Sequence, residues 1–206
     1  MRSSLMAATA LLAAWLATAQ EADHPADALA IKGERAFHIM KTLPIEASFY
    51  QPETAALAKA GIPEKYGHEE WAAVVLTNEV HQHVGIYTIL GAKMGVRAKE
   101  LLEAPPRAVT VTVETGTKPP LSCMIDGLQV ALGSTYAQDL IHAPKREKPC
   151  AAAVFEYQGR KVRLTLKPEV REKVAAIIAA AIKEYGNLTP AYFDRIEKES
   201  YRVWAE

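Results

Sequence analysis

The chain has 206 residues; its 24 Lys and Arg balance its 24 Asp and Glu, and half of its residues are hydrophobic. This length suits one globular domain, and the apolar fraction excludes an intrinsically disordered chain. The neutral charge balance argues against nucleic acid or an anionic membrane as the main partner, because both need a basic surface. Two cysteines are too few for a disulfide-rich scaffold or a four-cysteine zinc site.

Residues 1–19 have the features of a secretory signal peptide. Arg2 gives a positive start, Leu5 to Leu16 form a short apolar run, and Ala17-Thr18-Ala19 supplies a small-residue cleavage pattern before Gln20. The apolar run is shorter than the roughly 20 residues that span a bilayer, although an uncleaved anchor is the alternative. We therefore expect a secreted or periplasmic product without a membrane span, in a compartment where disulfides persist.

The N-terminal part of the remaining chain predicts helices. Residues 20–67 form a helical lead-in, with a short helix over 53–60 that ends at Gly61 and Pro63. Residues 69–80 are apolar and β-branched, so their periodicity does not separate helix from strand. Residues 84–103 have helical spacing and stop before two prolines, and Gly91 and Gly95 lie one turn apart, which lets another backbone approach closely.

The second part of the chain mixes strands with helices. Residues 109–113 alternate Val with Thr and predict a half-buried strand. After a loop, Ser122 is a plausible N-cap for a helix over 123–132, and the pattern over 137–149 is typical of a surface loop. Residues 151–157 and 161–166 predict a hairpin, followed by two helices over 167–206. This order indicates an α+β fold with a C-terminal helical extension.

A His-x-His pair, His81 and His83, is the first candidate metal-binding feature. In an extended segment or a turn, residues i and i+2 can reach one ion, whereas in a regular helix they point about 200° apart. A metal site therefore requires that 81–83 not be helical throughout. His68 and His142 are weaker candidates, and His24 and His38 have no recruiting neighbours.

The second feature is a predicted helix face that carries Cys123, Asp126 and Gln129 at i, i+3 and i+6. Cys123 lies at the helix start, where the helix dipole favours the thiolate that binds metals. Asp126 is suited to be a ligand or to hydrogen-bond a ligand imidazole. Imidazole with thiolate suits zinc better than calcium or magnesium. The alternative for Cys123 is a disulfide with Cys150.

The stretch from His81 to Gly95, HQHVGIYTILGAKMG, resembles the HGHLCPGLALGYRAG signature of the E-type domain family of formylmethanofuran dehydrogenase. CMIDGLQV, which starts at Cys123, is similar to the family's CAVDAIQV, and the hairpin is a weaker match. The resemblance implies a metal-binding domain over 68–166, with a small mixed or antiparallel sheet packed with helices. It implies zinc held by His81, His83 and Cys123, with Asp126 and Gln129 as the fourth ligand or in support of the ligands.

This chain departs from the family pattern at two cysteine positions, which are Gly85 and Ser134 here, and it lacks the C-terminal zinc-ribbon cysteines of some members. The departures and the signal peptide indicate a stand-alone exported relative rather than a component of the dehydrogenase. We expect an exported zinc-binding protein with an unidentified small-molecule or protein partner, and homodimerisation is possible. One alternative is a zinc-dependent hydrolase with an open coordination position and Asp126 or Glu79 as base; another is a metal-free scaffold with a Cys123–Cys150 disulfide.

Overall fold

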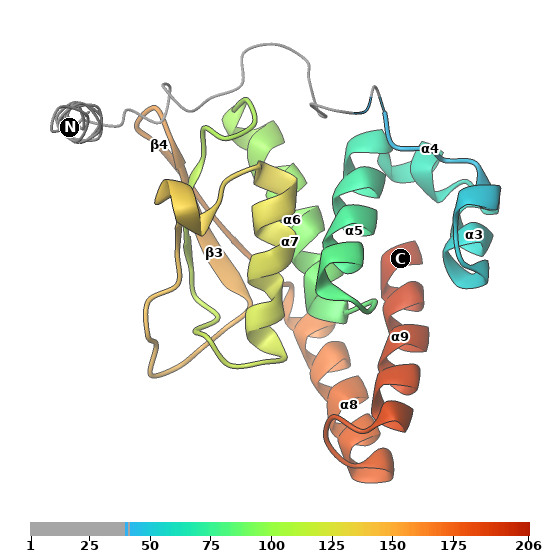
Figure 1. Ribbon diagram of the computed structural model, residues 1–206. Coiled ribbons are helices and arrows are strands. Elements are labelled where there is room, and N and C mark those ends of the chain that lie inside the picture. Colours follow the sequence, from blue (N-terminus) through green and yellow to red (C-terminus); the bar gives the residue numbers. More distant parts are fainter. Residues whose placement is uncertain (1–39, 41) are drawn as a thin grey trace, which may run out of the picture.

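The computed structural model describes Met40 and residues 42–206; the predicted signal peptide and the first part of the helical lead-in, up to residue 39, lie outside this range. Figure 1 shows the helices that the structure describes, which are α3 (Pro52–Lys59), α4 (Ile62–Tyr66), α5 (His68–His81), α6 (Ile86–Leu102), α7 (Met124–Leu132), α8 (Pro168–Tyr185) and α9 (Pro190–Ala205). The strands are β1 (Thr110–Val113), β2 (Ile141–His142), β3 (Ala152–Tyr157) and β4 (Arg160–Thr165). Short 3₁₀ turns are η1 (Ala47–Phe49), η2 (Leu121–Cys123) and η3 (Tyr136–Gln138).

The four strands form one mixed sheet in the order β2-β1-β3-β4. β1 pairs with β2 in parallel, whereas β1–β3 and β3–β4 are antiparallel. Val111 and Val113 of β1 are fully buried, while the threonines between them are partly exposed, as the alternation predicts. The predicted α+β class with a small mixed sheet is confirmed. β2 was not predicted, because it has two residues and lies within the charged, proline-containing segment expected to be a loop.

The β3–β4 hairpin is confirmed, and its turn has a simple backbone cause. Gln158 and Gly159 both have positive φ angles, 46° and 75°. A two-residue turn with two positive φ angles matches the right-handed twist of the flanking strands, and glycine adopts this conformation without steric cost. The turn thus fixes the register in which Tyr157 pairs with Arg160.

Helices α6 and α7 cross in direct backbone contact, and this contact depends on glycines. A Cβ added to Gly91 would overlap the carbonyl oxygen of Met124, and one added to Gly127 would overlap the carbonyl oxygen of Thr88. The close approach predicted from Gly91 and Gly95 is therefore present, and Gly127 supplies its counterpart on α7. The crossing places the first turn of α7 against the first half of α6.

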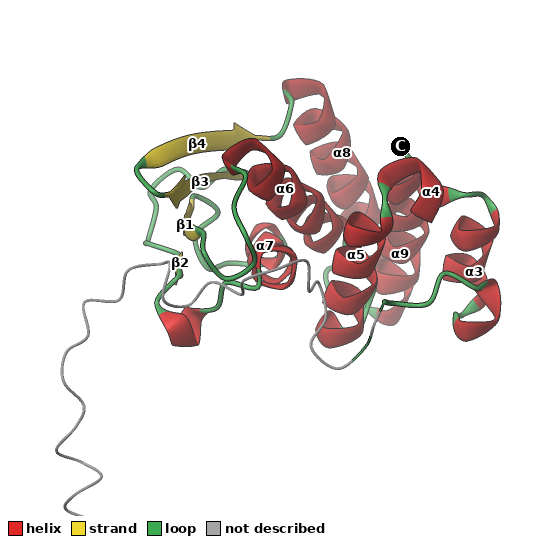
Figure 2. Ribbon diagram, turned by 90° about the horizontal axis from the view of Figure 1, so that it is seen from above, coloured by secondary structure: helices red, strands yellow, loops and turns green. Residues whose placement is uncertain are grey.

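The remaining helices form a second layer. Figure 2 shows α6 and α7 between the sheet and the group that contains α5, α9, α3 and α4. Buried Val111, Phe155 and Leu128 fill the space between the sheet and α6–α7. Trp71 of α5 stacks on Trp204 of α9 with ring centroids 5.0 Å apart, and this pair anchors the second core.

Local signals predicted most helix ends. α8 and α9 begin at prolines as expected, and the Thr189 hydroxyl caps α9 by accepting from the Tyr192 backbone N–H at 3.2 Å. The segment 69–80, left open between helix and strand, is helical. Ser122 is not a cap, because η2 runs directly into α7 and places Cys123 at the N-cap position without a side-chain bond. None of the helices described is both long and apolar enough to cross a membrane.

Candidate metal centre

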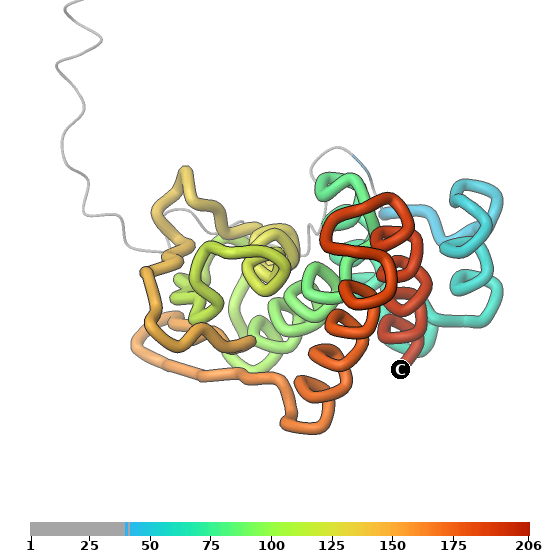
Figure 3. Tube along the Cα trace, turned by 90° about the horizontal axis from the view of Figure 1, so that it is seen from below, coloured from blue at the N-terminus to red at the C-terminus, as the bar shows by residue number. Residues whose placement is uncertain are grey.

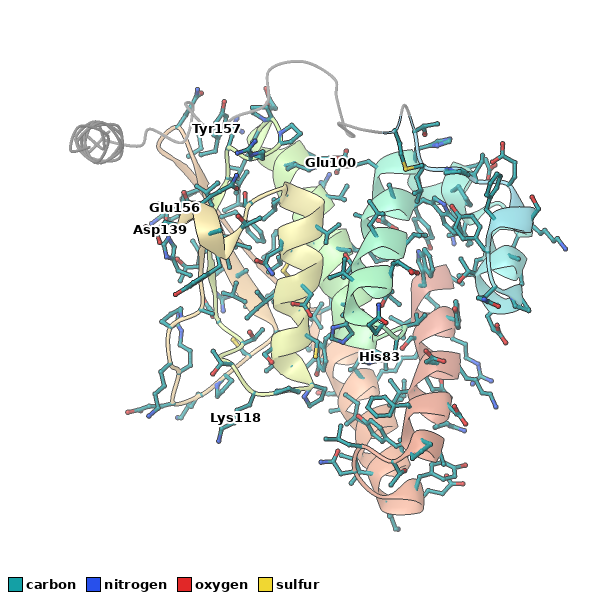
Figure 4. All side chains as sticks on the ribbon, viewed as in Figure 1. His83, Glu100, Lys118, Asp139, Glu156 and Tyr157 are labelled. Carbon is teal, nitrogen blue, oxygen red and sulfur yellow. The ribbon has the colours of Figure 1, made fainter. Side chains whose placement is uncertain are left out.

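The two histidines of the His-x-His pair lie where α5 ends and the chain turns into α6. His81 is the last residue of α5, and Gln82 takes the left-handed conformation with φ 64°. This turn brings the two imidazole rings together, with centroids 4.4 Å apart. The requirement that 81–83 not be continuous helix is thus met, by a turn rather than a strand. Figure 4 shows His83 at the end of α5, beside α9.

A buried asparagine fixes this turn. The Asn78 side-chain oxygen accepts the Gly85 backbone N–H at 2.9 Å and the Thr88 hydroxyl at 2.6 Å. Its amide nitrogen donates to the Val74 carbonyl within α5 at 2.7 Å. A buried amide with all of these partners holds a loop in one conformation, since breaking the set would leave buried polar groups unpaired. Asn78 was not singled out from the sequence, where a polar residue in a mostly apolar stretch is the only signal.

Asp126, in the first turn of α7, reaches the His81 side chain. His81 Nδ1 donates to Asp126 Oδ2 at 2.8 Å. The close crossing of α6 and α7 makes this contact possible, because it brings the start of α7 next to the turn after α5. A carboxylate on one imidazole nitrogen fixes the ring orientation and leaves the other nitrogen for a ligand.

That other nitrogen, His81 Nε2, is buried and has no hydrogen-bond partner among the described residues. The hydrogen bond with Asp126, followed by the interaction with Cys123, raises the pKa of His81 to about 9 against the opposing effect of burial. The Cys123 thiol therefore lies close to the same imidazole. With a pKa of about 9 the His81 ring is protonated at pH 7, so a metal ion that binds Nε2 would have to displace its proton.

His83 has a different environment. Burial, and secondly the nearby His81, lowers the pKa of His83, so its imidazole is neutral at pH 7. Its ring meets Phe193 edge-on, with centroids 5.1 Å apart. The Val84 backbone N–H donates to Glu197 of α9 at 3.1 Å, which ties the histidine turn to that helix.

Helix α9 also closes this region from the side of the thiol. Tyr192 is buried, and its pKa is raised first by burial and then by the nearby Cys123. Tyr192 packs edge-on against Phe193, with ring centroids 5.5 Å apart. Neither residue was a candidate from the sequence, because their only sequence signal is apolar helical spacing, which is typical of any packed helix.

The side chains of His81, His83 and Cys123 are of the types that bind metal ions, but they do not lie close enough together in this structure to bind the same ion. In the part of the chain that the structure describes, no three His, Cys, Asp or Glu side chains converge closely enough to hold an ion. The unpaired His81 Nε2 and the neutral His83 are the two features that fit a metal. Binding one ion would require these side chains to draw together.

A comparison with protein families gives a match over residues 80–200 to the family described as "FmdE, Molybdenum formylmethanofuran dehydrogenase operon". The chain belongs to the FmdE family. The match covers more than half of the FmdE-family chain, and it includes the His-x-His turn, α7, the sheet and most of the two C-terminal helices. The resemblance to the E-type domain family of formylmethanofuran dehydrogenase is thereby confirmed at the level of the family. A comparison with curated proteins finds no match.

Several other candidates from the sequence lie away from this centre. The Gln129 side chain accepts from the Tyr136 backbone N–H at 3.4 Å. The Nδ1 atom of His142 lies 3.6 Å from the Oδ1 atom of Asp139. His68 is exposed at the start of α5. His24 and His38 lie outside the described residues. Of the expected site residues, the structure therefore places His83, Cys123 and Asp126 each near His81, without a common point of convergence, and leaves Gln129 aside.

The proposed Cys123–Cys150 disulfide is not present, and both cysteines are free. The Cys150 thiol donates to Glu114 Oε2 at 3.3 Å, beside the end of β1, whereas Cys123 lies with His81. Burial and the neighbouring carboxylate of Glu114 raise the pKa of the Cys150 thiol. The two sulfurs thus lie in separate polar surroundings. The predicted Cys123–Cys150 disulfide, on which the alternative of a metal-free scaffold depends, is therefore wrong.

Proposed function

We propose that this FmdE-family protein binds a zinc ion through His81, His83 and Cys123. The observation that carries the proposal is His81, whose Nδ1 is bonded to Asp126 while its buried Nε2 has no partner among the described residues. Carboxylate–histidine pairs of this kind orient metal ligands, and two imidazoles with one thiolate suit zinc. Asp126 supports the ligand in this proposal, and Gln129 has no part in it.

The proposed role is metal binding or carriage rather than hydrolysis. Three protein ligands leave one zinc position for water or for a group from a partner. In the hydrolase alternative, Asp126 or Glu79 would act as the base, but the Asp126 carboxylate already accepts a hydrogen bond from His81. Only Glu79, which is exposed, is left for that task. Chelator-sensitive turnover of esters, phosphates or amides that is lost in Glu79→Gln would favour the hydrolase.

We further propose that the protein is exported, on the signal-peptide features of residues 1–19. Mass spectrometry of the protein recovered from an expressing cell tests this point. The expected product begins at Gln20 and is found outside the cytoplasm. A product that retains Met1 or Arg2 and stays in the cytoplasm contradicts export, without bearing on the metal site.

Metal analysis of the purified protein tests the zinc proposal. The expected content is about one zinc per chain, lost in His81→Ala, His83→Ala and Cys123→Ser. His142→Ala is the matched control, since His142 also lies near a carboxylate but outside the centre. Full zinc content in both His83→Ala and Cys123→Ser, or equal loss in His142→Ala, would overturn the proposed ligand set.

A further inference from the structure

Helix α8 packs on the rest of the molecule through one side only. Val174 and Ala181, which lie seven residues apart, are buried in a cluster that includes Ile86 of α6 and Ile196 of α9. Figure 3 shows α8 and α9 side by side, and in Figure 2 α8 lies at the edge of the molecule beyond α6. The opposite side of α8 is exposed, and no element that the structure describes covers it.

This exposed side is apolar over most of its length. Residues 174–182 contain no polar side chain, although they form about two and a half helical turns. The outer face of α8 is defined here as the residues that recur at helical spacing on the exposed side, namely Glu172, Ala175, Ala176, Ala179, Ile182 and Lys183. Its three alanines are exposed, and the large side chain of Ile182 is 39% exposed. A helical stretch that is apolar on all sides is typical of one that another element covers.

Two opposite charges stand at the ends of this face. Glu172 precedes the alanines and Lys183 follows them, about 16 Å farther along the helix axis at about 1.5 Å per residue. Neither forms an ion pair with any residue that the structure describes. The positions three and four residues away from each carry no opposite charge, so α8 itself offers no partner. Both charges are therefore free to pair with another molecule.

We propose that the outer face of α8 pairs with the same face of a second copy, in an antiparallel homodimer. A two-fold axis midway between positions 177 and 178 places Glu172 opposite the partner's Lys183, and Lys183 opposite the partner's Glu172. Such a contact uses the same patch on both subunits and closes at the dimer. The same axis places Ala176 opposite the partner's Ala179, and small side chains let two helices approach closely.

The charges select both the occupant and its direction. A parallel pair would place Glu172 beside the partner's Glu172, and like charges at an interface repel each other. A helix that lies on an anionic membrane carries several Lys and Arg on its polar side, whereas this face ends in one acid and one base. The self-complementary pattern therefore favours a second copy. This inference goes beyond the proposed zinc site and depends on none of its ligands.

Analytical ultracentrifugation of the purified protein tests whether the dimer forms. The expected result is a reversible dimer with a dissociation constant of about 1–100 µM, because one pair of helices is a small interface. A protein that stays monomeric at about 1 mM overturns the proposal. Cys123→Ser is expected to lose zinc and to dimerise as before, so the two proposals fail separately. Loss of the dimer in Cys123→Ser, with folding retained by circular dichroism, would contradict a contact made by α8 alone.

Charge exchange tests the antiparallel pairing. Glu172→Lys and Lys183→Glu are each expected to raise the dissociation constant about tenfold or more, because each brings like charges together at both ends of the pair. The double variant exchanges the two charges, and its dissociation constant is expected to return to within about threefold of the original. Glu64→Lys, at an exposed position of α4, is the matched control. No recovery in the double variant, or equal weakening by Glu64→Lys, contradicts the pairing.

A change in the middle of the face separates this dimer from other occupants. Ala179→Glu is expected to abolish the dimer without unfolding the protein, since Ala179 is exposed. A dimer that persists in Ala179→Glu uses another surface and overturns the assignment. Sedimentation with phosphatidylglycerol vesicles tests the membrane alternative, and the expected result is no binding. Vesicle binding by the original protein that is lost in Ala179→Glu would assign the face to a membrane instead.

Discussion

The His81 imidazole and the Asp126 carboxylate form a hydrogen bond of 2.8 Å that joins the last residue of α5 to the first turn of α7. The two residues are 45 positions apart in the chain. The bond fixes His81 so that its buried Nε2 has no partner among the described residues, and it makes Asp126 the support of a proposed metal ligand. The proposed zinc site depends on this relationship.

Removal of the Asp126 carboxylate should weaken zinc binding without abolishing it. Asp126→Ala is expected to raise the dissociation constant for zinc about 10- to 100-fold, because the His81 ring loses the group that orients it. Competition with a chromophoric chelator measures this change. Gln129→Ala, on the same helix but bonded toward Tyr136, should leave the affinity unchanged; a larger loss in Gln129→Ala than in Asp126→Ala would reverse the assigned roles.

Asn78 should stabilise both the fold and the histidine turn. Asn78→Ala removes a buried acceptor for the Gly85 N–H and the Thr88 hydroxyl, so the free energy of unfolding is expected to fall by about 2 kcal/mol. Chemical denaturation measures the change, and zinc affinity should fall in parallel. Val80→Ala, at a neighbouring position that is 73% exposed, should change stability by less than about 0.5 kcal/mol. Equal stability of the two variants would argue against this role for Asn78.

The crossing of α6 and α7 should not tolerate a methyl group at Gly127. The added Cβ would overlap the backbone of Thr88 and Ala92, which cannot move aside as a flexible side chain can. Gly127→Ala is therefore expected to destabilise the protein by about 3 kcal/mol, at the upper end of overpacking effects. Thermal unfolding measures this against Gln129→Ala on the same helix. A melting temperature like that of the unmodified protein would disprove the close crossing.

Much of the fold could be predicted because its signals are local. Alternation of Val and Thr marks β1, Gly159 between two strand-like segments marks the hairpin turn, and prolines mark the starts of α8 and α9. These features act within a few residues, so one sequence displays them. Strand β2 could not be predicted, since its two residues are extended only through pairing with β1.

The candidate site was predictable in its residue types but only in part in its pairings. The His-x-His spacing and the helix-start cysteine identified His81, His83 and Cys123 as candidates. A hydrogen bond from Asp126 to a ligand imidazole was one of the two roles expected for Asp126, and the structure shows it at His81. The choice of His81 and the proximity of Tyr192 to Cys123 arise from packing between elements far apart in the chain.

A separate ion pair should make stability depend on pH in the acid range. Arg163 donates to both Glu114 oxygens, at 2.9 and 2.8 Å, and this interaction lowers the pKa of Glu114 to about 2. A lowered carboxyl pKa stabilises the folded state fully above its usual value of 4.5, and this contribution is lost as the pH falls from there through about 2. Glu114→Gln should therefore cost about 1.5 kcal/mol at pH 7 and almost nothing near pH 2.

Urea denaturation at several pH values measures this difference. Glu156→Gln is the control, because Glu156 pairs with Lys161 on the exposed part of the same sheet. Exposed pairs of this kind contribute about 0–1 kcal/mol. An effect of Glu114→Gln that stays constant from pH 7 to pH 2 would disagree with the lowered pKa.

X-ray absorption at the zinc edge of the zinc-loaded protein tests the central claim most directly. The account predicts one sulfur ligand at about 2.3 Å, from Cys123, and two imidazole nitrogens at about 2.0–2.1 Å, from His81 and His83. The sulfur contribution should disappear in Cys123→Ser and persist in Cys150→Ser. A spectrum with oxygen ligands alone, or a sulfur signal lost in Cys150→Ser instead, would contradict the proposed centre.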